Sequence, residues 1–181
     1  MKERLKTGLV EEIEIPMGVR VELKEGVLRL EGKQGSISRN FYNPQVKIGL
    51  DEKEIRLETR RDTKREKKLL GSLKSHIKNM VAGVNRGYIY RLKICSSHFP
   101  MNVSVAGGNL IVKNFLGEKV PRKLKLKNGV RVNVEGEIIT VDSPNKELAG
   151  QVAADIEQLT RITDKDKRIF QDGIYITEKG K

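Results

Sequence analysis

The chain has 181 residues, of which 37% are hydrophobic and only 4% aromatic, so its core must be built mainly from Val, Ile and Leu. Its 36 Lys and Arg residues outnumber 24 Asp and Glu residues, and the net charge of +12 indicates a polyanionic partner, nucleic acid before a membrane surface. No apolar stretch approaches the roughly 18 residues of a membrane-spanning segment. The amino terminus resembles no secretory signal and Cys95 is the only cysteine, so we expect no membrane partner and a cytoplasmic location.

One pattern of elements occurs twice along the chain. Residues 16–21 read Pro-Met-Gly-Val-Arg-Val, and residues 100–105, 84 positions later, read Pro-Met-Asn-Val-Ser-Val. Each copy opens an alternating strand, followed by a glycine-centred turn, a second short strand and a glycine before a third strand. Later strands at 54–58 and 137–141 each lead into the long helical pattern of their half. This order indicates a duplicated domain.

The first helix is predicted from about Lys64 to Ala82. Six apolar side chains fall on one face at helical spacing: Leu69, Leu70, Leu73, Ile77, Met80 and Val81. Thr63 and Glu66 have the spacing of a capping box, and Gly83 suits the position just past the carboxyl end.

The second helix is predicted from about Asn145 to Arg161, after Ser143-Pro144, with its buried face formed by Leu148, Val152, Ile156 and Leu159. Before it, the sequence Lys-Asn-Gly-Val at 127–130 is a two-residue hairpin signal, which predicts pairing between strands at 124–127 and 130–134.

These patterns predict an α+β fold that is a tandem duplication of a small domain, each copy an antiparallel β-sheet packed against one long helix. The predicted divisions are a first repeat over 1–83, a second repeat over 84–164 and a carboxyl-terminal extension over 165–181. The extension has no counterpart in the first half.

The positive charge is distributed unevenly. Residues 86–131 contain one acid, Glu118, against ten basic side chains: Arg86, Arg91, Lys93, Lys113, Lys119, Arg122, Lys123, Lys125, Lys127 and Arg131. Residues 132–164 reverse the sign, with seven acids and two bases. Alternating Lys and apolar residues can simply be the solvated face of a strand, but ten bases against one acid favour a binding face for a polyanion.

Two further basic segments are candidates. The carboxyl-terminal extension carries Lys165, Lys167, Arg168 and Lys179, together with Tyr175, whose ring could stack on a base or ribose. Arg60, Arg61 and nearby lysines surround the start of the first helix, where an ordinary solvated helix start is the competing interpretation.

Catalytic and cofactor patterns are scarce in the sequence. Cys95 and His98 are three residues apart, which more often reflects the edge of a core than a thiol with its base. His76, beside Ile77 on the first helix, is expected to pack. The glycine clusters lack the spacing of a nucleotide-binding loop, and no metal-ligand cluster is present. We therefore expect no enzymatic activity, no cofactor and no small-molecule substrate.

Four segments resemble a known family. They read Ser-His-Phe-Pro at 97–100, Asn-Phe-Leu-Gly-Glu-Lys at 114–119, His-Ile-Lys-Asn-Met at 76–80 followed by Gly-Val, and Asp-Gly-Ile-Tyr at 172–175 followed by Glu-Lys-Gly at 178–180. In their order along the chain, these four segments resemble large-subunit ribosomal protein six, in its archaeal and eukaryotic branch. The resemblance runs from about Val10 to Gly180.

The resemblance implies a scaffold of two tandem α+β domains, attached to large-subunit ribosomal RNA near the stalk base and the sarcin-ricin loop and adjoining other large-subunit proteins. It also implies that the second domain and the tail make the main RNA contacts. The tail departs from bacterial relatives, which carry a Lys- and Gly-rich stretch where residues 165–171 are mixed in charge.

Together with the charge distribution, these observations predict the following RNA-binding residues: Arg86, Arg91, Lys93, Lys113, Asn114, Lys119, Arg122, Lys123, Lys125, Lys127, Lys165, Lys167, Arg168, Tyr175 and Lys179. Two alternatives stay open. A free-standing basic nucleic-acid-binding protein or RNA chaperone would share the basic surface, and an RNA-modifying enzyme would need a cofactor loop or acid-base pair that the sequence does not display.

Overall fold

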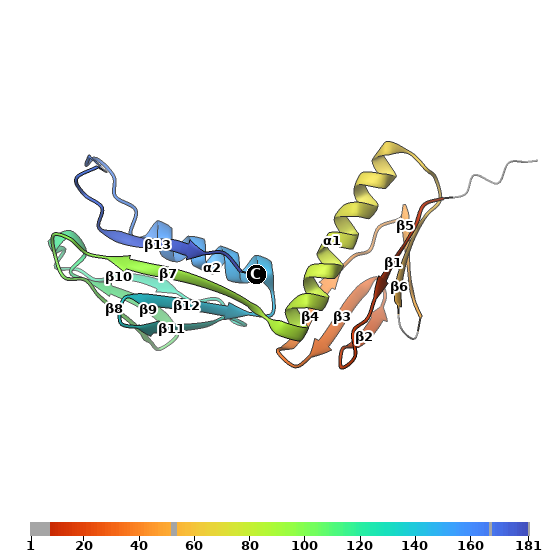
Figure 1. The fold of residues 1–181 in the computed structure, drawn as a ribbon, viewed down its shortest axis with the longest axis horizontal. Helices are drawn as coiled ribbons and strands as arrows, with labels where there is room; N and C mark the ends of the chain where they lie inside the picture. Colours follow the sequence, from red (N-terminus) through yellow and green to blue (C-terminus); the bar gives the residue numbers. More distant parts are fainter. Residues whose placement is uncertain (1–7, 52–53, 167, 181) are drawn as a thin grey trace, which may run out of the picture. The chain divides into compact units, whose positions relative to one another are not determined.

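The computed structural model describes residues 8–51, 54–166 and 168–180 (Figure 1). The chain forms two compact units, Met1–Arg86 and Gly87–Lys181, each with one long helix and antiparallel strands. The predicted α+β class and the duplication are confirmed. Neither helix in the part of the chain that the structure describes is long and apolar enough to cross a membrane.

In the first unit the strands form two antiparallel sheets, ordered β1-β6-β5 and β2-β3-β4, and α1 follows β6. The elements are β1 (Val10–Glu14), β2 (Arg20–Lys24), β3 (Val27–Gly32), β4 (Gly35–Asn40), β5 (Val46–Leu50), β6 (Glu54–Thr59) and α1 (Lys64–Arg86).

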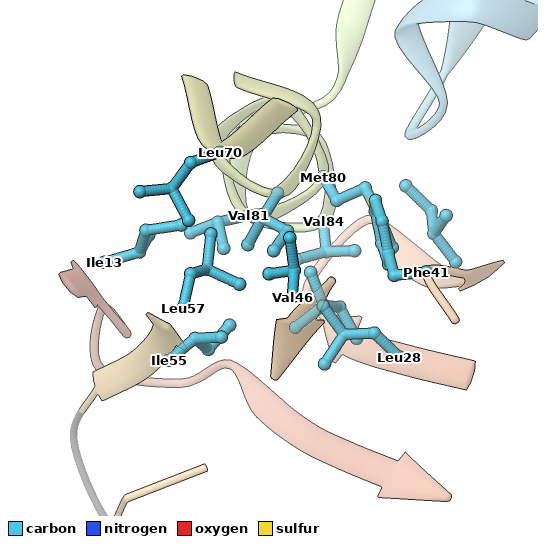
Figure 2. Packing of buried hydrophobic residues seen from close by; sticks show 13 residues of the cluster. Ile13, Leu28, Phe41, Val46, Ile55, Leu57, Leu70, Met80, Val81 and Val84 are labelled. Atoms are coloured by element: carbon cyan, nitrogen blue, oxygen red, sulfur yellow. The ribbon is translucent and has the colours of Figure 1, made fainter. Parts of the chain in front are cut away.

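The core of this unit lies between α1 and the strands. Figure 2 shows Leu70 and Val81 of α1 above Ile55 and Leu57 of β6, with Ile13 of β1 beside them. All five side chains are buried. Each strand supplies alternate residues because successive side chains of a strand point to opposite faces. The predicted helix face is confirmed, with Leu69 and Leu73 partly buried at its margin.

The predicted start of α1 is confirmed, but its predicted end is wrong. At the start, the Thr63 hydroxyl contacts the Glu66 carboxylate, and the Glu66 N–H approaches Thr63 Oγ1 at 3.5 Å. At the end, Gly83 is buried inside the helix, which continues to Arg86. Gly87, with φ of 77°, takes the left-handed position that terminates it. The helix continues past Gly83 because Val84 is fully buried and extends the apolar face.

The second unit also contains two antiparallel sheets, ordered β10-β9-β8 and β11-β12-β7-β13. Its elements are β7 (Tyr88–Cys95), β8 (Asn102–Ala106), β9 (Asn109–Lys113), the short 3-10 helix η1 (Phe115–Gly117), β10 (Arg122–Lys125), β11 (Arg131–Glu135), β12 (Ile138–Ser143), α2 (Lys146–Leu159) and β13 (Gly173–Glu178).

The predicted hairpin around 127–130 is wrong. β10 pairs with β9 and β11 pairs with β12, so the two strands on either side of Asn128-Gly129 belong to different sheets. Gly129 still turns the chain, with φ of 86°, but its carbonyl accepts a hydrogen bond from the Ser143 hydroxyl at 2.8 Å. Local turn chemistry was correctly identified here, whereas strand pairing was decided by the rest of the unit.

The segment after α2 belongs to the second unit. β13 pairs with β7 in antiparallel register, Ile174 opposite Ile94, and Ile174 is fully buried in the core with Val152 and Ile156 of α2. Asn145 caps α2, its side-chain oxygen accepting from the N–H groups of residues 147 and 148. The extension is therefore partly structural: it completes the sheet as well as carrying charge.

The pairing orders match between the units. The order β1-β6-β5 corresponds to β7-β12-β11, and β2-β3-β4 corresponds to β8-β9-β10, with α1 matching α2. β13 has no counterpart among the described strands of the first unit. The match allows each surface of one unit to be compared with the same surface of the other.

Candidate nucleic-acid interface

The outer face of the sheet β8-β9-β10 is basic. Lys123 and Lys125 are exposed and alternate with Leu124, which packs on the core. Lys113, at the end of β9, lies on the same face, because Ile111 stands opposite Lys123 and side chains two apart share a face. These three fully described strands contain no Asp or Glu. We call Lys113, Lys123 and Lys125, with the polar residues beside them, the basic sheet face.

Three polar side chains accompany these lysines. Asn102 stands opposite Lys113, Ser104 opposite Ile111, and Asn109 opposite Lys125. Amides and hydroxyls hydrogen-bond phosphate and sugar oxygens, and lysines neutralise phosphates. The basic sheet face therefore has the chemistry of a surface for an RNA backbone.

The equivalent face of the first unit mixes both signs of charge, with three basic residues on β2 and β3 against two acids. On β2 and β3, Glu22 stands opposite Arg29 and Arg20 opposite Glu31. Opposite charges across neighbouring strands cancel at distances beyond the Debye length of about 8 Å in physiological salt. The same sheet architecture thus carries a focused positive potential only in its second copy.

Arg122 points away from the basic sheet face. Its guanidinium donates to both carboxylate oxygens of Glu118, at 2.9 and 2.5 Å, and to the Leu159 carbonyl at 2.7 Å, and it lies 4.3 Å from the Phe115 ring centre. The hydrogen bond from Arg122 lowers the pKa of Glu118. Arg122 therefore joins the η1 loop to the end of α2.

Lys127 also differs from its neighbours, because its Nζ lies 3.2 Å from a carboxylate oxygen of Asp155 on α2. Lys123, Lys125 and Lys127, all predicted to bind RNA, are thus divided by the fold. Lys123 and Lys125 share an open face, and Lys127 is in an ion pair.

The outer face of the four-stranded sheet brings together three other predicted residues. Lys93 stands opposite Tyr175, and Arg91 donates to Glu178 at 2.9 Å. Tyr175 is 42% exposed, and its hydroxyl approaches the Asp172 carbonyl at 3.4 Å. Burial raises the pKa of Tyr175, and the neighbouring Cys95, Asp172 and Glu157 raise it further, so the phenol remains a neutral donor. Lys179 follows β13 and is exposed.

A cavity of about 590 Å³ lies beside Tyr175. It is lined by the end of α2 and the following loop, including Thr160 and Arg161, and by Phe170 and Ile174. The volume of the cavity falls in the range of small-ligand pockets. The Phe170 ring and the Arg161 guanidinium suit an unstacked base. Sequence reasoning missed Arg161, because it lies in the stretch counted as acidic.

Asp172 joins two of the segments that carried the family resemblance. It is 1% exposed, and its Oδ1 accepts the N–H groups of Ser97 at 2.6 Å and His98 at 3.0 Å, while its Oδ2 lies 2.6 Å from His98 Nδ1. Burial alone raises the pKa of Asp172, but the hydrogen bonds from His98 and Ser97 outweigh it and lower the pKa to about 2. No sequence signal marked this contact between residues 74 apart.

The His98 ring also stacks on Phe170, with ring centres 4.8 Å apart, and Lys165 places its Nζ 4.5 Å from the Phe170 centre. Arg168 is paired with Asp166 at 2.8 Å and is highly exposed. Lys167, also predicted to bind RNA, lies outside the described residues. The part of the extension preceding β13 therefore adds cations and stacked rings to the second unit.

The remaining predicted residues are more scattered. Lys119 is exposed in the loop after η1, and Asn114, with φ of 60°, donates through its side-chain amide to the Pro100 carbonyl at 3.1 Å. Arg86 is the last residue of α1 and belongs to the first unit. Arg60 and Arg61 are exposed before α1.

The side chains that could suggest catalysis have structural partners. Ser97 Oγ and Asp172 both contact the same ring nitrogen of His98, so no proton relay runs through the imidazole. His76 is half-buried and its Nδ1 lies 3.2 Å from an Arg39 nitrogen. Within the described residues no group of three or more His, Cys, Asp or Glu side chains could hold a metal ion.

The fold and this surface define a class: a duplicated α+β protein whose second copy presents a focused basic face. Comparison with known proteins agrees. The family model described as "Ribosomal protein L6" matches residues 15–87 and again 99–173, one match in each half. The chain belongs to this ribosomal protein family, which is structural and non-enzymatic.

Similar proteins are named "Large ribosomal subunit protein uL6". That of Natronomonas pharaonis is 44% identical over 167 residues, covering 92% of this chain and 94% of the relative. That of Nanoarchaeum equitans is 45% identical, covering 93% and 92%, and that of Saccharolobus solfataricus is 44% identical, covering 94% and 95%. The resemblance to the archaeal and eukaryotic branch of the family is confirmed, and the relatives named here are archaeal.

Proposed function

We propose that this protein is a structural constituent of the large ribosomal subunit whose second unit binds large-subunit ribosomal RNA. The observation that carries the proposal is the basic sheet face, where lysines and polar side chains meet with no carboxylate on the three strands. Family membership and the names of the relatives support the ribosomal setting.

We further propose that the contact lies near the stalk base and the sarcin-ricin loop, which the family resemblance implies. The surface is proposed to extend to Lys93, Tyr175 and Lys179, with Lys119, Lys165 and Arg168 on the adjoining loops. Arg122 and Asn114 are proposed to shape this surface, because their polar groups are already engaged.

The test is to reverse two charges on the basic sheet face, with Lys123→Glu and Lys125→Glu together. We expect binding to large-subunit RNA fragments to weaken by tenfold or more, about 1.4 kcal/mol. The slope of the logarithm of the binding constant against the logarithm of the salt concentration should become shallower by about one per lost phosphate contact. Filter binding at several salt concentrations measures both.

The matched control is Lys24→Glu with Lys33→Glu, two exposed lysines of the first unit. Equal weakening by the two pairs would show that the binding face has been misplaced. A scaffold should also prefer a structured large-subunit fragment to random duplex at raised salt. Equal loss for both RNAs would instead favour the free-standing RNA chaperone.

A further inference from the structure

The open edge of β1 in the first unit corresponds to an edge that is filled in the second. β7, the counterpart of β1, pairs on one side with β12 and on the other with β13 (Figure 1). β1 pairs with β6 and, among the described strands, with no strand on its other side. The duplicated fold therefore shows what kind of element this position accepts: an extended, antiparallel strand.

The backbone of β1 is oriented to receive a strand. The Thr59 N–H donates to the Leu9 carbonyl at 2.9 Å, so Leu9 directs its peptide groups toward β6. Alternation along the strand then directs the peptide groups of Val10, Glu12 and Glu14 toward the open side. Unpaired edges of this kind are templates for strand addition.

A groove of about 440 Å³ lies along this edge. It is lined by Glu12, Ile13 and Glu14 of β1 and by Lys78, Val81, Ala82 and Asn85 of α1. In the second unit the equivalent space between strand and helix holds β13, whose Ile174 and Ile176 N–H groups donate to Thr160 and Glu157 at 2.9 and 3.1 Å. The groove thus offers an apolar floor with polar groups at its margins.

The charges of the two edges are opposite. Ile13 pairs with Ile55 of β6, and Leu92 pairs with Ile139 of β12, the corresponding buried positions of corresponding strands. In this register Glu12 corresponds to Arg91 and Glu14 to Lys93. Because Arg91 pairs with Glu178 of β13, the occupant of the β1 edge should carry basic residues where β13 carries its glutamate.

We propose that β1 binds a basic, extended segment of another protein by antiparallel strand addition. Glu11, Glu12 and Glu14 make a second copy of this chain a poor occupant, because pairing two β1 strands brings like charges together. The same carboxylates disfavour RNA. Glu11 is already paired with Lys74, which leaves Glu12 and Glu14 at the edge, although Glu12 lies 3.8 Å from Arg56.

The test uses the full chain and a synthetic peptide, Lys-Gly-Ile-Tyr-Ile-Thr-Lys-Lys, which is β13 with lysine replacing its glutamate and added at both ends. We expect saturable binding that slows hydrogen exchange at the backbone amides of Glu12 and Glu14. NMR monitors this exchange. The same peptide with glutamate at the lysine positions should bind about tenfold more weakly or not at all. No RNA is present, so this result is independent of the proposed RNA contact.

Two variants localise the effect. Glu12→Lys with Glu14→Lys should weaken binding of the lysine peptide about tenfold or more, whereas the control Glu22→Lys with Glu31→Lys, on the other sheet, should leave it within about twofold. Glu12→Pro removes an N–H that points to the open side and takes none from the ladder with β6, so it should abolish binding while circular dichroism stays unchanged.

Three results would overturn the proposal: no perturbation at Glu12 and Glu14, equal binding of the two peptides, or no effect of the charge reversal. Sedimentation equilibrium tests for a dimer. If a dimer is present and Glu12→Lys with Glu14→Lys changes its amount, a second copy of the chain occupies the edge. Tighter peptide binding by a chain lacking residues 1–7 would show that this segment covers the edge itself.

Discussion

At the scale of single residues, the most informative side chain is Asp172. It is almost fully buried, and it holds the loop at 97–98 through two backbone N–H groups and the His98 ring. Charge-assisted hydrogen bonds of this kind outweigh the desolvation of the carboxylate, which is why its pKa falls despite burial. The contact unites segments that come from opposite ends of the second unit's sequence.

Asp172→Asn is expected to destabilise the second unit by about 2 kcal/mol, because the amide keeps one acceptor and loses the charge that both N–H groups share. Urea unfolding at neutral pH measures the change. The control is Asp166→Asn, whose carboxylate is paired with Arg168 on an exposed turn. We expect the stability of the control to equal that of the parent within the error of the measurement.

The pH dependence follows from the lowered pKa. A carboxyl group with a folded pKa of about 2 against an ordinary 3.8 stabilises the fold fully above pH 3.8, and this contribution is lost as the pH falls toward 2. The contribution is about 2 kcal/mol. Stability curves of the parent and of Asp172→Asn should therefore converge in acid, and parallel curves down to pH 2 would contradict this account.

At the scale of elements, β13 has two roles. Its inward face completes the core through Ile174, and its outward face places Tyr175 beside Lys93. A strand that is paired and packed in this way holds an aromatic ring in a defined position, which a mobile tail would not do. The proposed RNA contact of Tyr175 thus depends on the burial of its neighbour.

Ile174→Ala is expected to cost about 2 to 4 kcal/mol in the stability of the second unit, because it removes a fully buried side chain and leaves a cavity. Thermal and urea unfolding of the whole chain provide the measurement. Ile169→Ala, at a position 63% exposed, should change stability by less than about 0.5 kcal/mol. Similar small losses at both positions would mean that β13 is only loosely attached.

At the scale of the whole molecule, duplication has produced two units with different surfaces on one architecture. The first has a sheet face of mixed charge and an acidic strand edge, and the second has the basic sheet face and the extra strand. Total charge does not separate them. Residues 1–86 hold 20 basic and 13 acidic residues, and residues 87–181 hold 16 and 11.

We therefore expect a fragment of residues 87–181 to retain specific binding to large-subunit RNA, and a fragment of residues 1–86 to lose it, although the latter has the higher net charge. Segregated lysines focus potential on one face, and alternating signs cancel. Filter binding at fixed salt, after circular dichroism has shown both fragments folded, makes the comparison. Equally tight binding by the first fragment would refute the role assigned to charge segregation.

The sequence by itself determined the class of fold, the duplication and the family. Strand alternation, helical spacing and capping are local properties, so the apolar face of α1 and its start at Thr63 could be read directly. Motif order then identified the family. The same local patterns placed lysines on strands and the basic surplus in the second half.

Only the tertiary structure decided which side chains work together. The turn at Asn128-Gly129 was recognisable, but its flanking strands lie in different sheets, because β10 pairs with β9 and β11 pairs with β12. Lys123 and Arg122 are adjacent in sequence, yet one faces solvent and the other is held by Glu118 and Leu159. Asp172 meets its partners across the unit. Periodicity reports which face of an element a residue occupies, whereas packing between distant elements decides what lies opposite that face.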